Sequence, residues 1–195
     1  TRLSGAVLLA ASAVLSAQQP AAPAPQPQQP TSVELRLTGE SGTPPRLAVP
    51  DLLALSPDRE TQDAARTISE VLWNDLNFER EFSLIPRATY KSIPAAGSID
   101  AVPFDRWREL GADGVIIGTV QKSATGIRVE MRLYNVRARQ SAYGREYTGS
   151  AANPRIYAHT MSDELHDSQR SLRGVARTKL TFISDRNREA VLATV

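Results

Sequence analysis

The sequence predicts an α/β (α+β) domain in which a mixed β-sheet carries packed helices. Three patterns indicate this class. Apolar residues recur at helical spacing over residues 58–76. Val115–Ile117 is a continuous apolar run, typical of a strand buried on both faces. Residues 127–133 alternate apolar and charged side chains, the period of a half-buried strand. Helices interleave with strands early and a strand meander follows, an order that favours a mixed sheet with helices on it.

The amino-terminal end has the layout of a secretory signal peptide over residues 1–17. Arg2 provides a positive start, an apolar run follows, and small residues precede a cleavage position after Ala17. Ala11-Ser12-Ala13 is a competing cleavage site. The apolar run is shorter than the roughly 20 residues that cross a bilayer, so no membrane insertion is expected. Residues 18–31, rich in Pro, Gln and Ala, predict an extended tether.

The elements of the folded part follow in order from local patterns. Val33, Leu35 and Leu37 alternate with Glu34 and Arg36, which predicts a first strand. Glycines and prolines interrupt it, and residues 46–49 form a second strand. The helix over 58–76 has acidic residues near its start. A strand at 81–85 ends at a proline.

The second half begins with a short helix from Pro103 that Gly111 closes. The strands at 115–117 and 127–133 form a hairpin about a turn at 123–126, and residues 141–148 add a third strand. Asn153-Pro154 opens a long helix expected to run to about Ala176. Residues 179–185 predict a further strand with no local partner, the start of something larger.

Composition restricts the chemistry. The 195 residues include no cysteine and two histidines, and the net charge is +2. Thiolate zinc sites, cysteine nucleophiles and disulfides are therefore excluded. The arginines at 66, 106, 108, 137 and 139 alternate with acids, the pattern of a mixed surface, so nucleic acid is not an expected partner.

No motif of an enzyme site is present. The sequence lacks a P-loop, a G-x-S-x-G and a dinucleotide fingerprint. His159 and His166 are seven residues apart, whereas zinc helices need ligands four apart. The acids at 163, 164 and 167 are interpreted as a solvated helix face. Trp73 and Trp107 are expected to anchor the core, with ligand stacking as the alternative. We expect no catalytic residue, cofactor or metal.

The segment Ser32–Thr38 has two interpretations that its pattern leaves open. It is either an ordinary first strand or a short β-segment, next to a flexible tether, that adds to another protein's sheet. Gly39 and Gly42 follow it, so it can detach without unravelling the core.

Several motifs in order resemble one protein family. They are Val33–Leu37 with Arg46–Pro50, Val71–Leu76, Trp107–Asp113 before Val115–Gly118, Tyr157–Glu164 and Thr178–Arg186. The order and spacing of these motifs resemble those of the TolB family, which belongs to the periplasmic Tol–Pal system.

The resemblance implies an amino-terminal α/β domain over residues 32–177 and the start of a truncated β-propeller over residues 178–195. It implies a non-enzymatic periplasmic adaptor, active in outer-membrane constriction during division. A TolA-like inner-membrane protein would bind the amino-terminal segment, here Val33, Glu34, Leu35, Arg36 and Leu37. A Pal-like lipoprotein would bind only the propeller, beyond these residues.

The alternative is the amino-terminal part of an exported propeller-containing serine hydrolase. A G-x-S-x-G motif with Asp and His after Val195 would decide for this alternative.

Overall fold

The computed structural model describes residues 36–37, 43–179, 181–184 and 191–194. The predicted signal peptide, the tether and Val33–Leu35 lie outside the described residues. The chain divides into two compact units, Thr1–Val33 and Glu34–Val195, and all described residues belong to the second.

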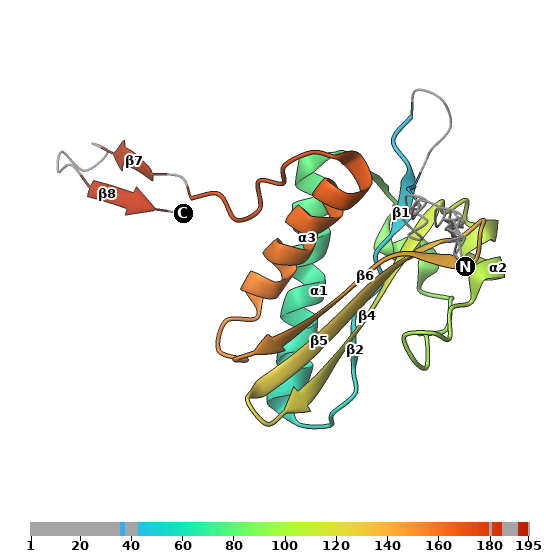
Figure 1. Cartoon of the computed structure of the whole chain (residues 1–195), viewed down its shortest axis with the longest axis horizontal. Helices are drawn as coiled ribbons and strands as arrows, with labels where there is room; N and C mark the ends of the chain where they lie inside the picture. Colours follow the sequence, from blue (N-terminus) through green and yellow to red (C-terminus); the bar gives the residue numbers. More distant parts are fainter. Residues whose placement is uncertain (1–35, 38–42, 180, 185–190, 195) are drawn as a thin grey trace, which may run out of the picture. The chain divides into compact units, whose positions relative to one another are not determined.

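The elements alternate between strands and helices before a three-strand meander (Figure 1). The strands are β1 (Arg46–Ala48), β2 (Leu53–Ala54), β3 (Ser83–Leu84), β4 (Gly114–Ser123), β5 (Gly126–Asn135), β6 (Gln140–Gly149), β7 (Thr181–Ser184) and β8 (Val191–Thr194). The helices are α1 (Arg59–Glu79), the 3-10 turn η1 (Arg87–Tyr90), α2 (Phe104–Glu109) and α3 (Arg155–Arg170).

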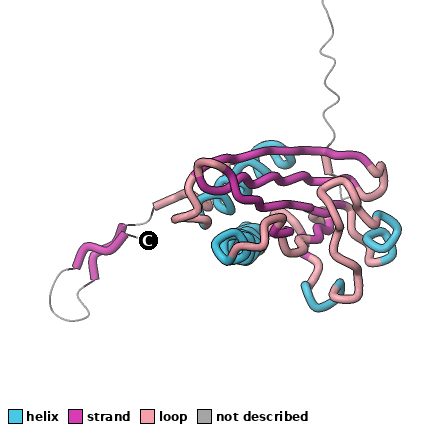
Figure 2. The backbone as a smooth tube through the Cα atoms, turned by 90° about the horizontal axis from the view of Figure 1, so that it is seen from below, coloured by secondary structure: helices cyan, strands magenta, loops and turns pink. Residues whose placement is uncertain are grey.

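The main sheet is mixed, as predicted. Its order is β3-β1-β4-β5-β6, and β2 also pairs with β4. The pairs of β1 with β3 and β4, and of β2 with β4, are parallel. The meander β4-β5-β6 is antiparallel, and its three strands run side by side in one layer (Figure 2).

The helices α1 and α3 lie side by side on one face of this sheet (Figure 1). Asp58 begins α1 by accepting the backbone N–H of Thr61 at 3.0 Å, an ordinary N-cap. The larger core cluster forms between these helices and the sheet, with fully buried Ile68, Leu72, Met161 and Leu165 among its members. This core fixes α3 against α1.

The opposite face of the sheet is covered by η1, α2 and the loop between them. Trp107, Tyr90 and Ile85 form a second buried cluster there with Val115 and Ile117 of β4. Because Ile116 of the same strand belongs to the first cluster, β4 is buried on both faces. This explains the continuous apolar run in the sequence.

Two predictions near the carboxyl end are wrong. The helix α3 ends at Arg170, not near Ala176, because Ser171 adopts φ 54° and the Leu172 N–H donates to the His166 carbonyl, a Schellman-type end. The strand predicted at 179–185 has a local partner after all, since β7 pairs antiparallel with β8.

Candidate functional site

The two described residues of the predicted partner-binding segment lie at the carboxyl end of α3. The Leu37 backbone N–H donates to Gln169 Oε1 at 3.0 Å, and Arg36 Nη1 donates to Ser171 Oγ at 3.0 Å. Gln169 is buried on the last turn of α3, and Ser171 is the left-handed residue that ends the helix. The end of α3 therefore holds this part of the segment.

Leu37 is a core residue, 1% exposed, in the cluster beneath α1 and α3. Its side chain fills the space above Gly114, the first residue of β4. A Cβ at Gly114 would lie 2.6 Å from Leu37 Cδ1 and 3.1 Å from Leu47 Cδ1. The glycine thus provides room for the leucine to pack against the sheet.

The prediction of a first strand is wrong at Arg36 and Leu37, which belong to no strand. The physical reason is that the buried Leu37 side chain and the end of α3 hold these residues away from the sheet edges. The Leu37 N–H is bonded to a side-chain amide instead of a ladder carbonyl. Val33, Glu34 and Leu35 lie outside the described residues, and their role in partner binding stays a prediction.

Gln169 and Ser171 were not found by sequence reasoning, although one of them leaves a signal. Gln169 lies four residues after buried Leu165, on the face that α3 turns toward the core. A polar side chain in a buried stripe requires a hydrogen-bond partner, and here that partner comes from residue 37. Ser171 has no such pattern.

The segment after α3 is also tied to the domain. Asp163 Oδ1 accepts the Ala176 N–H at 2.9 Å, and its Oδ2 accepts Arg177 Nε at 2.7 Å. A Cβ on Gly174 would lie 2.4 Å from the Asp163 Cα, so this close approach requires glycine. Asp163 is 8% exposed, and the interpretation of the acids around it as a solvated face is wrong here.

Glu164 also does not fit the interpretation of these acids as a solvated helix face. Its Oε2 accepts hydrogen bonds from the hydroxyls of Tyr143 at 2.9 Å and Tyr147 at 2.8 Å, and Arg145 Nε lies 3.4 Å away. Burial is the largest cause that raises the pKa of both tyrosines, and the hydrogen bond to this carboxylate is the next. The cluster joins β6 to α3.

The two histidines join α3 to α1. His159 Nδ1 lies 2.7 Å from Asp75 Oδ2, and His166 Nδ1 lies 2.8 Å from the Ser162 carbonyl and 3.2 Å from Glu79 Oε2. Burial raises the pKa of the Asp75 and Glu79 carboxyls. Within the described ranges, no group of three His, Cys, Asp or Glu residues could hold a metal.

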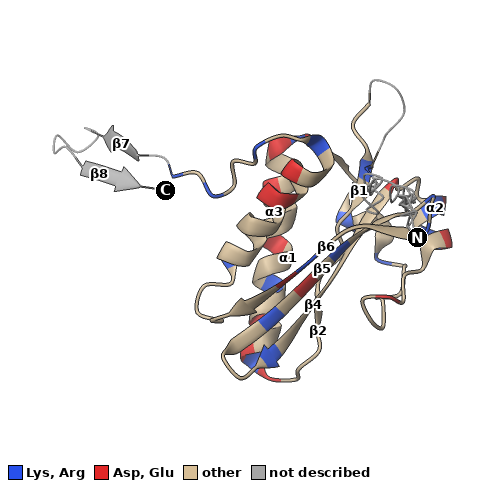
Figure 3. Cartoon of the chain, viewed as in Figure 1, with Lys and Arg blue, Asp and Glu red and all other residues tan. Residues whose placement is uncertain are grey.

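The charged surface is mixed, as the sequence indicated. Arg108 Nη2 and Arg139 Nη2 each lie 2.6 Å from Asp105 Oδ1, and Arg128 Nη2 lies 2.6 Å from Glu146 Oε2. Figure 3 shows basic and acidic side chains interspersed along β5. Of the helices described, none is long and apolar enough to cross a membrane.

Comparison with known proteins decides the family. The model of the TolB amino-terminal domain matches residues 33–142, more than half of the chain. The chain belongs to the TolB amino-terminal domain family. This match starts at Val33, so it includes the segment that ends in Leu37.

Curated relatives carry the name Tol-Pal system protein TolB. The chain is 27% identical over 124 residues to the protein of Hydrogenovibrio crunogenus, covering 63% of this chain and 28% of the relative. It is 30% identical over 121 residues to that of Xylella fastidiosa, covering 62% and 27%. The chain thus spans less than a third of the length of these relatives.

Among solved structures, the crystal structure of TolB from Acinetobacter baumannii matches with a TM-score of 0.55 and 19% identity, covering 71% of this chain and 31% of that chain. At this identity the match shows a shared fold. It supports the α+β assignment of the TolB amino-terminal domain.

Proposed function

We propose that the chain is the amino-terminal part of a non-enzymatic periplasmic adaptor in a Tol–Pal system. A TolA-like inner-membrane protein binds the segment Val33–Leu37. A Pal-like lipoprotein binds a propeller that begins with β7, within residues 178–195. Linking these partners serves outer-membrane constriction during cell division. Family membership and the Tol–Pal names of the relatives support this role.

The anchorage of Leu37 is the observation that carries the proposal. The contacts that hold the two described residues include the burial of Leu37 and the hydrogen bonds to Gln169 and Ser171. A buried leucine contributes about 1.5–3 kcal/mol, and each hydrogen bond about 0.5–1.5 kcal/mol. Release therefore costs at least a few kcal/mol, which a row of backbone hydrogen bonds to a partner strand can offset.

Release leaves the sheet intact. Neither Arg36 nor Leu37 belongs to a strand, and β1 keeps its bonds to β3 and β4 when the segment leaves. The segment can thus give up its hydrogen bond to the side chain of Gln169 and pair with the edge of a partner's sheet.

The test is a titration of the partner's periplasmic domain with three forms of the protein. These are the full chain, a chain without residues 18–31 and a chain without residues 18–38. The proposal expects binding to survive loss of the tether and to disappear with the longer deletion. Because the longer deletion also removes buried Leu37, its thermal unfolding is measured first to show that the domain folds.

Equal binding by all three forms would place the partner site elsewhere in the chain. Export is tested separately by amino-terminal sequencing of protein from the periplasmic fraction, which should begin between Val14 and Pro20. A periplasmic protein that still begins at Thr1 would contradict export through a cleaved signal peptide.

A further inference from the structure

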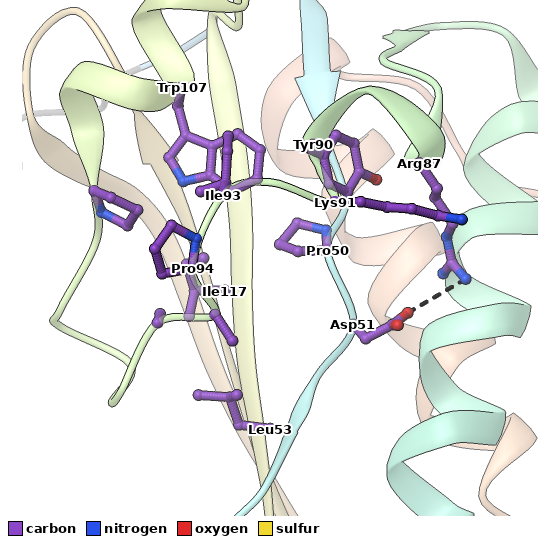
Figure 4. A pocket seen from close by; sticks show the side chains of 13 residues that line it. Pro50, Asp51, Leu53, Arg87, Tyr90, Lys91, Ile93, Pro94, Trp107 and Ile117 are labelled. Atoms are coloured by element: carbon purple, nitrogen blue, oxygen red, sulfur yellow. Dashed lines mark ion pairs between the residues drawn. The ribbon is translucent and has the colours of Figure 1, made fainter.

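A pocket of about 410 Å³ opens on the sheet face that η1 and α2 cover. Its apolar lining includes Pro50, Leu53, Ile93, Pro94, Trp107 and Ile117 (Figure 4). This volume lies in the range of small-molecule sites, about 300–1,000 Å³, which combine an apolar lining with a few polar groups. It is separate from the residues that hold Leu37.

Two buried donors of the lining have no acceptor among the described residues. Trp107 is 3% exposed, and its Nε1 makes no hydrogen bond there; the same holds for Nε of Arg87. In Figure 4 the indole edge that carries Nε1 faces toward Pro94. A buried donor without an acceptor costs about 1–3 kcal/mol. Because neither nitrogen is accessible, the hydrogen-bond donors that a ligand reaches come from the exposed rim of the pocket.

Arg87 is held firmly at the rim of the pocket. Its Nη2 donates to the Ser69 carbonyl at 2.7 Å, its Nη1 lies 3.3 Å from Asp51 Oδ1, and its guanidinium lies 5.8 Å from the centre of the Trp73 ring. Four residues along the chain, exposed Lys91 has no ion-pair partner in the part that the structure describes. The rim thus carries two cations and one acid, a charge of about +1 at neutral pH.

We infer that this pocket binds an amphipathic carboxylic acid. The apolar body lies beside Ile93, Pro94 and Trp107, and the carboxylate lies at Arg87 and Lys91. The net rim charge matches the single negative charge of a carboxylate, which accepts hydrogen bonds from the exposed Lys91 ammonium. This ligand site does not depend on the proposed adaptor role.

Tryptophan fluorescence tests the inference directly. The chain has two tryptophans, so Trp73→Phe leaves Trp107 as the only one and keeps an aromatic ring beside Arg87. We expect decanoate, added below its micelle concentration, to change this fluorescence saturably with one site per chain. Absence of a saturable change would overturn the inference.

Two further comparisons are made in the same Trp73→Phe background. Ala95→Phe fills the pocket and should abolish the change, whereas Ala101→Phe, an exposed residue of the same loop outside the lining, should preserve it. Lys91→Gln should weaken decanoate binding about 5- to 10-fold and leave decanol binding unaltered. Equal effects of the two alanine changes, or equal affinities of the original pocket for decanol and decanoate, would overturn the assignment.

Discussion

Truncation of Leu37 measures how strongly the amino-terminal segment is held. Leu37→Ala removes a side chain that is 1% exposed and packs above Gly114. Burial of this kind makes a Leu→Ala change cost about 2–5 kcal/mol. Because the segment can leave its site instead of spanning a cavity, the expected cost lies at the lower end, about 2–3 kcal/mol.

Urea denaturation of the purified chain is the assay. The midpoint should fall while the slope changes little, because the segment is a small part of the surface exposed on unfolding. Leu55→Ala is the matched control, since Leu55 is 51% exposed and should change stability by less than about 0.5 kcal/mol. Equal effects of the two changes would refute the reasoning that Leu37 anchors the segment.

Limited trypsin digestion gives an independent measurement. Cleavage after Arg36 requires the segment to leave the end of α3, since Leu37 is buried. Leu37→Ala should accelerate this cut before the rest of the domain is cleaved. An unaltered cleavage rate would mean that the leucine does not limit opening.

Three further predictions concern the rest of the domain. Gly174→Ala should destabilise the domain by about 1–3 kcal/mol, because the added Cβ would meet the Asp163 backbone. Gly97→Ala should be neutral, because its Cβ would lie in open space. Urea denaturation curves of the two variants test this difference. His166→Gln should cost about 1–3 kcal/mol and more than His159→Gln, because His166 is fully buried, with partner binding retained in both. Since the folded state raises the pKa of all five tyrosines, their contribution to stability should be constant below about pH 10 and be lost above it; phenolate absorbance that rises at pH 10 in the folded protein would contradict this.

The sequence predicts the elements whose periodicity is long. The helix α1, with 21 residues, and the strands β4, β5 and β6, with 10 residues each, are long elements, and the sequence predicts all four. By contrast, β2 and β3 have two residues each. Their assignment depends on parallel pairing with strands distant in the sequence, which no local pattern records.

The end of α3 was misplaced for a local reason. Its stop is Ser171 in the left-handed region, where glycine is the usual signal. Gly174 lies three residues later and serves a different need, the close approach to Asp163. A sequence pattern does not distinguish these two uses of the backbone.

Of the candidate site, the sequence predicts the burial of one residue. Alternation singled out Leu37 correctly as an inward-facing residue, but it implied a strand. The acceptor of its N–H is 132 positions away, in Gln169, and only the folded chain brings the two together. The pocket beside Trp107 depends in the same way on loops whose apolar residues show no period.

Partner affinity of a Gln169→Ala variant tests the central claim most directly, because this change leaves the segment itself intact. Loss of Oε1 deprives the buried Leu37 N–H of its acceptor and makes release easier by about 1–3 kcal/mol. Titration with the TolA-like periplasmic domain should then show binding about 5- to 150-fold tighter than that of the original chain. Gln140→Ala, at an exposed position on β6, should not change the affinity. Unchanged or weaker binding by Gln169→Ala would contradict the account that the partner captures a segment released from α3.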